Sequence, residues 1–339
     1  MPILPLFPVS EKSVSEKPAL VGIARLASQG ESLREGHNVE YFTLPAKSLL
    51  NRCASRRGVP FEWTINPYRG CEFACKYCYA RYTHEFMEMR EGVDFERKIY
   101  VKQHTAELLR QELRQVKQDD SIAIGAATDP YQPAERRYEV TRNILEEFSR
   151  HSGFHLGIIT KSNLILRDID VLQAVARHNR LSVNVTITTL DVELARILEP
   201  RAPRPDLRLE TIRQLSEAGL RVGMSGSPVL PGITDSPKDL EALVRAAAEA
   251  GAHHLFAGPL FLKPCSAAVF LPFLEKQFPH LVENYKRRYH NRAFLPAAYA
   301  KPLSQLVERL RQKYGIGHDP RRSQAIIPKT PAREQLSLF

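Results

Sequence analysis

Short apolar segments rich in β-branched residues alternate with longer amphipathic segments from residue 61 onward. The apolar segments have the length of strands, and the intervals repeat apolar positions at the spacing of one helix face. The predicted strands span residues 61–66, 121–127, 154–160, 181–188, 220–230 and 253–261. The predicted helices span residues 105–116, 141–150, 168–177, 207–218 and 237–250. Because such alternation is typical of a parallel sheet buried on both faces, six units predict an α/β fold, a partial (β/α)6 TIM-like barrel.

The two ends of the chain lack this alternation. Residues 1–58 show a helical pattern only around 45–53, so we expect an N-terminal extension that packs on the barrel. Residues 59–314 hold the barrel and its C-terminal helices, the last of which is predicted to end near Tyr314. Residues 315–339 are polar and basic and contain prolines. Since such a segment cannot bury enough apolar surface to order itself, we expect a flexible, disordered tail.

The chain carries an excess of basic residues, with a formal net charge of +10. This excess suits a polyanionic partner such as nucleic acid, although it also fits simple solubility. The hydrophobic fraction of 43% and the charged fraction of 25% are ordinary for a soluble domain. The first residues lack the basic region of a signal peptide, and no apolar run approaches about 18 residues. We therefore expect no membrane contact and a cytoplasmic location.

Three of the five cysteines, Cys71, Cys75 and Cys78, form one C-x3-C-x2-C run. A disulfide is disfavoured because a cytoplasmic chain keeps its thiols reduced, and thiolates this close together suit a metal better. Structural zinc normally takes four protein ligands, so a zinc site would need His84 to complete a Cys3His set. Three thiolates can instead bind three irons of a four-iron four-sulfur (4Fe–4S) cluster and leave the fourth iron open to a cofactor or substrate.

The run from Asn66 to Arg81, NPYRGCEFACKYCYAR, resembles the signature of the radical S-adenosylmethionine (radical SAM) superfamily, and Tyr77 and Tyr79 match that pattern too. The resemblance favours the cluster over zinc. It implies that the amino and carboxylate groups of SAM chelate the open iron. It also implies that an external electron donor reduces the cluster, and that electron transfer to SAM generates a 5′-deoxyadenosyl radical. The protein would then position and shield chemistry that the cofactors carry.

Polar residues follow the predicted strands, at the edge where parallel barrels place their chemistry. By the resemblance, Thr128 and Asp129 bind the amino group of SAM, although Asp129 could equally cap a helix. Lys161 could reach the SAM carboxylate, and Thr188 offers a hydroxyl for the ribose, whereas Asp191 is better interpreted as a helix N-cap. The predicted SAM-binding residues are Tyr77, Tyr79, Thr128, Asp129, Lys161 and Thr188.

Further segments narrow the resemblance. TDPYQPAE, TKSNLILRD, TTLD, LEPRAPRP and SPVLPGITD follow in the order of an uncharacterised bacterial branch related to spore photoproduct lyase, which reverses a thymine-dimer lesion in DNA. Spore photoproduct lyases keep a hydrogen-donor cysteine near the second strand tip, where this chain has Ala126 and Ala127. Reversal by the same hydrogen relay is therefore in doubt. Tyr131 or Cys265 could supply the hydrogen atom instead, and Cys265 could equally be a buried structural thiol.

The last five residues place three large apolar side chains at the end of the polar tail. Exposed apolar groups of this kind usually mark a partner. The pentapeptide resembles the Gln-Leu-x-Leu-Phe motif by which bacterial replication and repair proteins bind the DNA polymerase sliding clamp. The alternative is a terminal segment that packs back onto the barrel. The residues expected to contact the clamp are Gln335, Leu336, Leu338 and Phe339.

The sequence leaves three functions open. The first is a radical SAM enzyme that acts on DNA, in lesion repair or base modification, and is recruited by the sliding clamp. The second is a radical SAM enzyme that modifies RNA or a protein side chain. The third is a zinc-stabilised nucleic-acid-binding module without catalysis, which requires that the cysteines bind zinc rather than a cluster.

Overall fold

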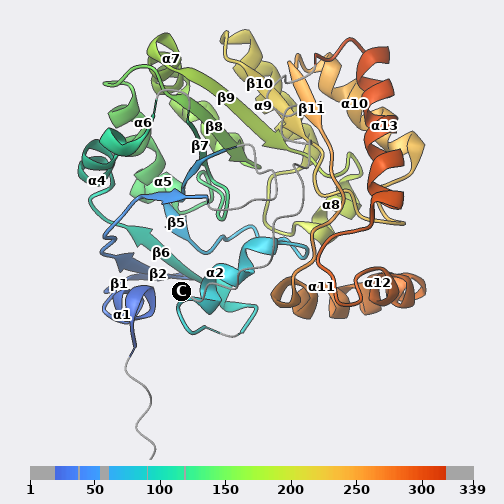
Figure 1. Ribbon diagram of the computed structural model, residues 1–339, viewed down its shortest axis with the longest axis horizontal. Helices are drawn as coiled ribbons and strands as arrows, with labels where there is room; N and C mark the ends of the chain where they lie inside the picture. The colour runs from blue at the N-terminus through green and yellow to red at the C-terminus, as the bar shows by residue number, and fades with distance from the viewer. Residues whose placement is uncertain (1–19, 37–38, 54–60, 90, 118–119, 318–339) are drawn as a thin grey trace, which may run out of the picture.

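Six parallel strands form the central sheet of the computed structural model, which describes residues 20–36, 39–53, 61–89, 91–117 and 120–317 (Figure 1). They are β4 (Trp63–Ile65), β7 (Ser121–Ile124), β8 (His155–Thr160), β9 (Arg180–Thr186), β10 (Val222–Ser225) and β11 (His254–Phe256). Each strand pairs in parallel with the next one of this series. The predicted α/β class and partial (β/α)6 barrel are confirmed.

The predicted helices cover the outside of this sheet. They are α4 (Thr105–Glu112), α6 (Val140–Phe148), α7 (Ile169–His178), α9 (Pro205–Glu217) and α10 (Pro237–Glu249). Figure 1 shows α4, α6 and α7 beside β7 and β8, and α10 beyond β11. Along β8, buried residues alternate with half-buried ones, so neither face of this strand is open to solvent. The connections contain η1 (Tyr79–Arg81), α2 (Tyr82–Glu85), α3 (Asp94–Arg97), η2 (Leu113–Gln115), α5 (Glu135–Tyr138), η3 (Asn163–Asp168) and α8 (Val192–Leu198).

Two helices begin at side chains that bind their free N–H groups. The carboxylate of Asp191 accepts hydrogen bonds from the N–H groups of Glu193 and Leu194, the second and third residues of α8, so its predicted role as an N-cap is confirmed. The hydroxyl of Ser236 caps α10 in the same way, and Pro237 follows as its first residue.

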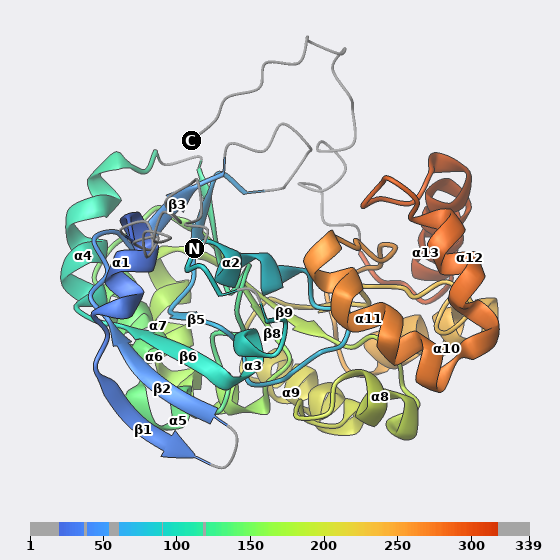
Figure 2. The ribbon, with the colours of Figure 1, turned by 90° about the horizontal axis from the view of Figure 1, so that it is seen from below.

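A second, four-stranded sheet contains most of the described N-terminal residues. Its order is β1 (Ser32–Gly36), β2 (Val39–Leu44), β6 (Lys98–Lys102) and β5 (Tyr68–Arg69). Figure 2 shows β1, β2 and β6 side by side, with α1 (Gly22–Ser28) against β2. This sheet matters for the site because β5 leads directly into the cysteine run.

The helix expected at residues 45–53 is absent, and that prediction is wrong. The segment contains β3 (Leu50–Arg52), which pairs antiparallel with β4 at the edge of the barrel. The backbone N–H groups of Leu49 and Leu50 donate to the carboxylate of Glu112, at 3.0 and 2.8 Å. Pairing with β4 and these bonds outweigh the weak helical periodicity of the segment.

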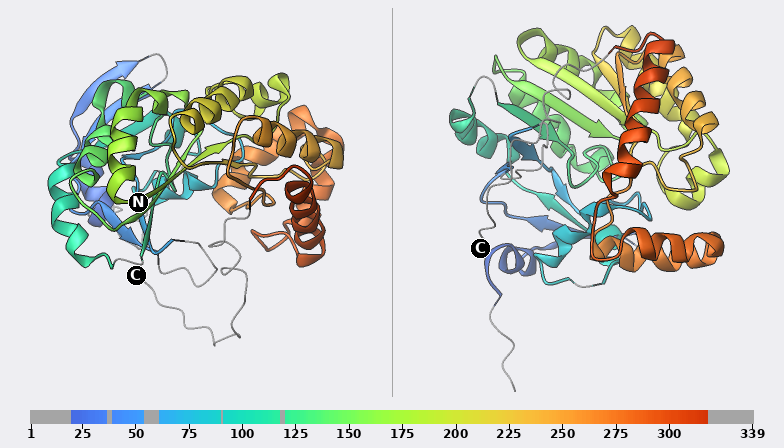
Figure 3. Two further views of the ribbon diagram at one scale, coloured as in Figure 1. Left: turned by 90° about the horizontal axis from the view of Figure 1, so that it is seen from above. Right: turned by 45° about the vertical axis from the view of Figure 1, so that its right-hand side comes forward.

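Three helices, α11 (Pro264–Gln277), α12 (Val282–Arg288) and α13 (Ala297–Lys313), lie at the opposite end of the molecule from β1 and β2 (Figure 3), with η4 (Pro279–Leu281) before α12. The fold continues past Tyr314, because Ile316 is buried and Gly317 forms a β-bridge with His254. The residues predicted to bind the clamp, Gln335, Leu336, Leu338 and Phe339, lie outside the described residues.

In the part of the chain that the structure describes, no helix combines the length and the apolar character that crossing a membrane requires.

Candidate active site

The cysteine run forms a loop between β5 and η1. It begins at Gly70, whose φ is +86° and where a Cβ would lie 2.7 Å from the carbonyl oxygen of Lys98. Only glycine therefore lets the loop pass this close to β6. Within the loop, the N–H of Cys78 donates to the carbonyl of Cys75 at 3.2 Å. Cys71 and Cys75 are buried in one apolar cluster, and the half-buried Cys78 packs against that cluster.

Burial favours the neutral form of these three thiols, and two nearby cations oppose it. Burial raises the pKa of each thiol, that of Cys75 to about 12. Asp129, Cys75 and Cys78 raise the pKa of Cys71 further. Lys161 opposes this effect at Cys75, and Arg81 opposes it at Cys78. Bound iron would reverse the balance, because a coordinating thiol is held deprotonated.

His84 does not join the cysteines. Its Nε2 lies 3.1 Å from the carbonyl oxygen of Lys98, and its ring packs edge-on against Phe95 and Tyr100. Burial lowers the pKa of His84 to about 4. Among the described residues, no group of three or more His, Cys, Asp or Glu side chains is placed to hold a single metal ion. The Cys3His zinc site finds no support, whereas in a 4Fe–4S cluster each thiolate binds a different iron.

Glu199 lies among three of the predicted SAM-binding residues, next to the cysteines. The hydroxyls of Tyr77 and Thr188 both donate to its carboxylate, the latter at 3.1 Å, and Nη2 of Arg208 lies 2.5 Å from Oε2. Nζ of Lys161 lies 5.8 Å from the ring centroid of Tyr77. Burial favours the neutral form of Glu199, but Arg208 and Lys161 outweigh it and lower the pKa of this carboxyl. An ionised glutamate therefore organises this part of the site.

Thr128 and Asp129 bind the protein itself. The carboxylate of Asp129 accepts bonds from Oγ1 of Thr160 and from the backbone N–H of Lys161, both at 2.7 Å. The hydroxyl of Thr128 donates to the carbonyl of Gly70 at 2.6 Å. These residues thus hold the tip of β8 and the start of the cysteine loop in place, so they position the backbone of the site.

Tyr79 and the two alanines at the tip of β7 border the cysteine loop. The hydroxyl of Tyr79 donates to the carbonyl of Ala126. The N–H of Ala127 donates to Oδ1 of Asn66 at 2.7 Å, and Ala127 packs against the apolar cluster that includes Cys71. The position at which the resemblance places a hydrogen-donor cysteine therefore lies next to the loop.

The two predicted hydrogen donors lie in different places. Tyr131 is fully buried in the barrel core, where burial and the carboxyls of Asp168 and Glu135 raise its pKa, so the structure does not bring it to the cysteines. Cys265 is half-buried in the first turn of α11, with Sγ 3.8 Å from Oγ of Ser266. That hydroxyl donates to the carbonyl of Cys78 at 2.9 Å. Cys265 therefore lies next to the cysteine loop.

A family model for the radical SAM superfamily matches residues 65–247, more than half of the chain. This chain belongs to the radical SAM superfamily. A relative from Mycobacterium tuberculosis, an uncharacterised protein, is 35% identical over 296 residues, which cover 86% of this chain and 87% of the relative. An uncharacterised protein of Methanocaldococcus jannaschii is 30% identical over 174 residues, which cover 51% of this chain and 62% of that protein.

The fold of this radical SAM protein is similar to that of spore photoproduct lyase. One solved structure, a mutant of that enzyme with dinucleoside spore photoproduct, matches with a TM-score of 0.62 at 15% identity. Another mutant, with bound SAM and dinucleoside spore photoproduct, matches with the same TM-score at 14% identity. Each match covers 81% of this chain and 79% of the lyase chain. At identities this low, the likeness shows a shared fold alone.

The cofactors of the radical SAM superfamily, a 4Fe–4S cluster and SAM, are the cofactors of this chain. The three cysteines fit the cluster, because they supply three sulfur ligands and no fourth side chain completes a metal cage within the described residues. Lys161 fits a carboxylate ligand, because its ammonium group has no hydrogen bond or ion pair in the described part of the chain while it is held beside Tyr77.

Sequence reasoning missed Glu199, Arg208 and Arg81. Glu199 belongs to the segment LEPRAPRP, which served only as a family marker. Arg81 ends the cysteine signature, and its Nη2 donates to the carbonyl of Cys75 at 3.0 Å and pairs with Glu96 at 2.8 Å. Glu199 bonds Tyr77 from a distant part of the chain, and Arg81 bonds a backbone carbonyl, so spacing along one sequence carries no signal for these contacts.

Proposed function

We propose that this radical SAM enzyme acts on DNA, in lesion repair or base modification. The observation that carries the proposal is the likeness to spore photoproduct lyase, a structure of which contains a dinucleoside lesion. The likeness covers 81% of the chain, more than the residues that match the superfamily model. A formal net charge of +10 also suits a polyanionic substrate.

In this proposal Cys71, Cys75 and Cys78 bind the cluster. Tyr77, Lys161 and Thr188 border the SAM site, with Lys161 as the partner of the SAM carboxylate. Thr128 and Asp129 act as positioning residues, because their polar atoms hold Gly70 and Lys161. Together the two cofactors supply the abstraction of a hydrogen atom from the substrate. The protein excludes water with the apolar side chains packed around the cysteines.

Cys265 is the hydrogen donor that this proposal prefers. Its thiol S–H bond would break as the hydrogen atom passes to a substrate carbon radical. An external thiol would return a hydrogen atom to the Cys265 sulfur, and the resulting thiyl radical would couple with a second one to form a disulfide. Tyr131 is less suitable because it is buried in the barrel core. Replacement of Cys265 by Ala should preserve iron content and SAM cleavage but reduce formation of the repaired or modified product.

DNA binding is the test of this function. Equilibrium binding of a DNA duplex to cluster-loaded protein should weaken as the salt concentration rises. Each phosphate that the protein neutralises should contribute about −0.9 to the slope of log K against log salt. Reduction of the net charge on exposed surface, for example by Arg136→Gln with Arg137→Gln, should lower that slope, since both side chains are exposed on α5. Absence of DNA binding even at low salt would exclude this function.

Recruitment by the sliding clamp completes the proposal. It rests on the sequence of the last five residues, and it predicts that Leu338→Ala with Phe339→Ala abolishes binding to the clamp measured by calorimetry. Iron content and SAM cleavage should stay at the wild-type level. A wild-type protein and a tail peptide that both fail to bind the clamp would remove recruitment from the account, and DNA binding by the barrel would be unaffected.

A further inference from the structure

Five aromatic rings from three chain segments meet beside the cysteine loop, and we call them the aromatic ledge: Tyr79, Tyr82, Phe86, Phe261 and Phe294. Phe261 and Phe294 stack with centroids 4.4 Å apart and planes at 28°. Tyr79 lies 6.0 Å from Phe261, and Tyr82 meets Phe86 edge-on at 5.8 Å. Figures 1 and 2 show α2, which carries Tyr82, beside the start of α11.

The ledge is open to solvent. Tyr79, Phe86 and Phe294 are 40%, 60% and 48% exposed. Every other Phe, Tyr or Trp side chain of the described residues is buried or half-buried. Single exposed apolar residues are ordinary, but all exposed aromatic rings in one group beside a catalytic loop mark a binding surface. The flat faces of these rings suit a flat partner.

Two cations flank the ledge. Nζ of Lys263 lies 3.6 Å from the ring centroid of Tyr82 and 5.8 Å from that of Phe261. Arg292 is exposed and lines a pocket together with Leu262 and Ala293, which are neighbours in the chain of the ledge residues Phe261 and Phe294. Within the described residues, neither cation has an ion pair or a side-chain hydrogen bond. Both are therefore available to an anion, and an aromatic surface with such cations nearby complements a nucleotide strand better than an apolar peptide.

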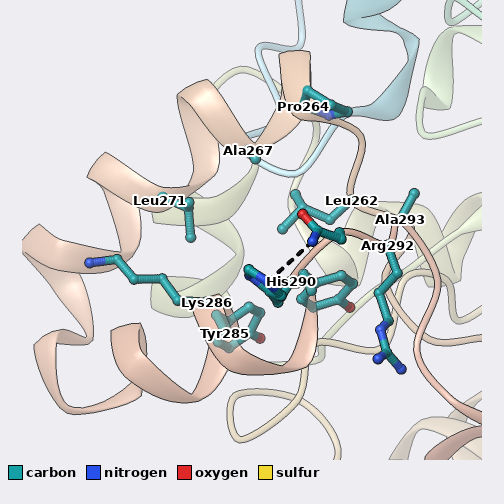
Figure 4. A pocket seen from close by; sticks show the side chains of 11 residues that line it. Leu262, Pro264, Ala267, Leu271, Tyr285, Lys286, His290, Arg292 and Ala293 are labelled. Atoms are coloured by element: carbon teal, nitrogen blue, oxygen red, sulfur yellow. Dashed lines mark hydrogen bonds between the residues drawn. The ribbon is translucent and has the colours of Figure 1, made fainter.

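A pocket of 540 Å³ adjoins the ledge between α11 and α12. Leu262 and Pro264, the neighbours of Lys263, line it together with Ala293, the neighbour of Phe294. Figure 4 shows Lys286 and Arg292 on opposite sides of this pocket. The pocket thus extends the ledge with apolar walls and further positive charge.

The ledge is fixed to the cysteine loop. Tyr79 follows Cys78 directly, and Oγ of Ser266 at the start of α11 donates to the carbonyl of Cys78 at 2.9 Å. The N–H of Leu262 donates to the carbonyl of Ala293 at 2.9 Å, which holds the segments of Phe261 and Phe294 together. A ligand on the ledge therefore lies next to the reactive end of the barrel.

We propose that the aromatic ledge stacks an unpaired base of a DNA strand, with the adjacent phosphates at Lys263 and Arg292. This inference rests on the proposed DNA substrate and specifies its form. Bases inside a duplex present only their edges, so an aromatic ring reaches a base face where the base has left the stack. The enzyme would act on single-stranded DNA or on a base extruded from a duplex.

The test measures fluorescence anisotropy of labelled oligothymidylate, of a duplex of equal length and of oligouridylate, each with cluster-loaded full-length protein. Wild-type protein should bind the single DNA strand more tightly than the duplex. Phe294→Ala should weaken single-strand binding about 5- to 150-fold, the range for loss of one stacked base, and leave duplex binding unchanged. Phe294→Trp should retain binding. Leu207→Ala, an exposed apolar truncation on α9, serves as the matched control.

Lys263→Gln should lower the salt slope for the single strand by about 0.7, as expected for one lost phosphate contact. Unchanged single-strand affinity in Phe294→Ala, or an equal loss of affinity for both DNA forms, would contradict base stacking on the ledge. Neither result would contradict DNA as the substrate. A preference for oligouridylate would overturn DNA as the occupant. Wild-type protein that binds none of the three would instead refute the proposed function itself.

Discussion

Glu199 is a buried carboxylate whose ionised form depends on its neighbours. Tyr77 and Thr188 donate to it, and Arg208 lies 2.5 Å from Oε2. Because Arg208 is itself almost fully buried, removal of either charge leaves the other without compensation in a low-dielectric environment. The pair therefore serves to place Tyr77 beside the cysteines, and its loss is costly.

Replacement of Glu199 by Ala should lower the free energy of unfolding by about 3–5 kcal/mol, because the Arg208 guanidinium stays buried and unpaired. Urea denaturation of the metal-free protein measures this loss. Glu193→Ala is the matched control, since Glu193 is exposed on α8 and its side chain has no partner in the described part of the chain. Equal stability of the two variants would contradict the role given to Glu199.

The buried His84 should make the free energy of unfolding depend on pH. Burial lowers its pKa in the folded protein to about 4, below the value of about 6.5 for an unfolded chain. The unfolded state therefore binds more protons between these values, and the free energy of unfolding should fall by up to about 3 kcal/mol as the pH drops from 6.5 to 4.

His84→Phe removes this titration and should flatten that part of the curve of unfolding free energy against pH. His280→Phe, at an exposed position, should leave the wild-type slope. Identical slopes for wild-type protein and His84→Phe would show that His84 does not titrate as described.

The cysteine loop depends on several elements at once. Residues at the tip of β7 hold its start, through Thr128 and Gly70, and the first turn of α11 holds its end, through Ser266 and Cys78. The loop itself has little regular structure, so these bonds replace the ladder that a strand would provide. The geometry of the cluster ligands is thus set by elements far away in sequence.

Ser266→Ala should lower the free energy of unfolding by about 1–3 kcal/mol, because the carbonyl of Cys78 loses its partner, and it should speed the loss of iron to a chelator. The fall in cluster absorbance with time measures the second effect. Ser216→Ala removes a comparable bond, to the carbonyl of Gly251, away from the cysteines. If both variants lose iron at the same rate, α11 does not stabilise the loop.

The barrel strands were predictable because they are short apolar runs that alternate with helical patterns, and all six lie where expected. The second sheet was not, since β5 has two residues and its strands come from distant parts of the chain. In the site, the cysteines and Asp191 were visible from local spacing. The partners of Glu199 and of Asp129 were not, because burial and contacts across the fold decide which polar groups remain available to a ligand.

The molecule as a whole combines a shielded radical site with an open, basic exterior. Apolar side chains surround the cysteines, while the aromatic ledge and its two cations lie at the solvent edge of the same loop. Such an arrangement lets a large polymer present one reactive unit to the site while the rest of it stays outside. The net charge of +10 would hold that polymer near the barrel.

The central claim is that the hydrogen atom abstracted by this enzyme comes from DNA. Reduced, cluster-loaded protein is incubated with SAM and with deuterated DNA, damaged or undamaged, and 5′-deoxyadenosine is analysed by mass spectrometry. The account predicts that DNA stimulates 5′-deoxyadenosine formation and that deuterium from the DNA appears in it, whereas Cys75→Ala yields neither. Formation of 5′-deoxyadenosine at one rate with and without DNA, and free of deuterium, would contradict the account.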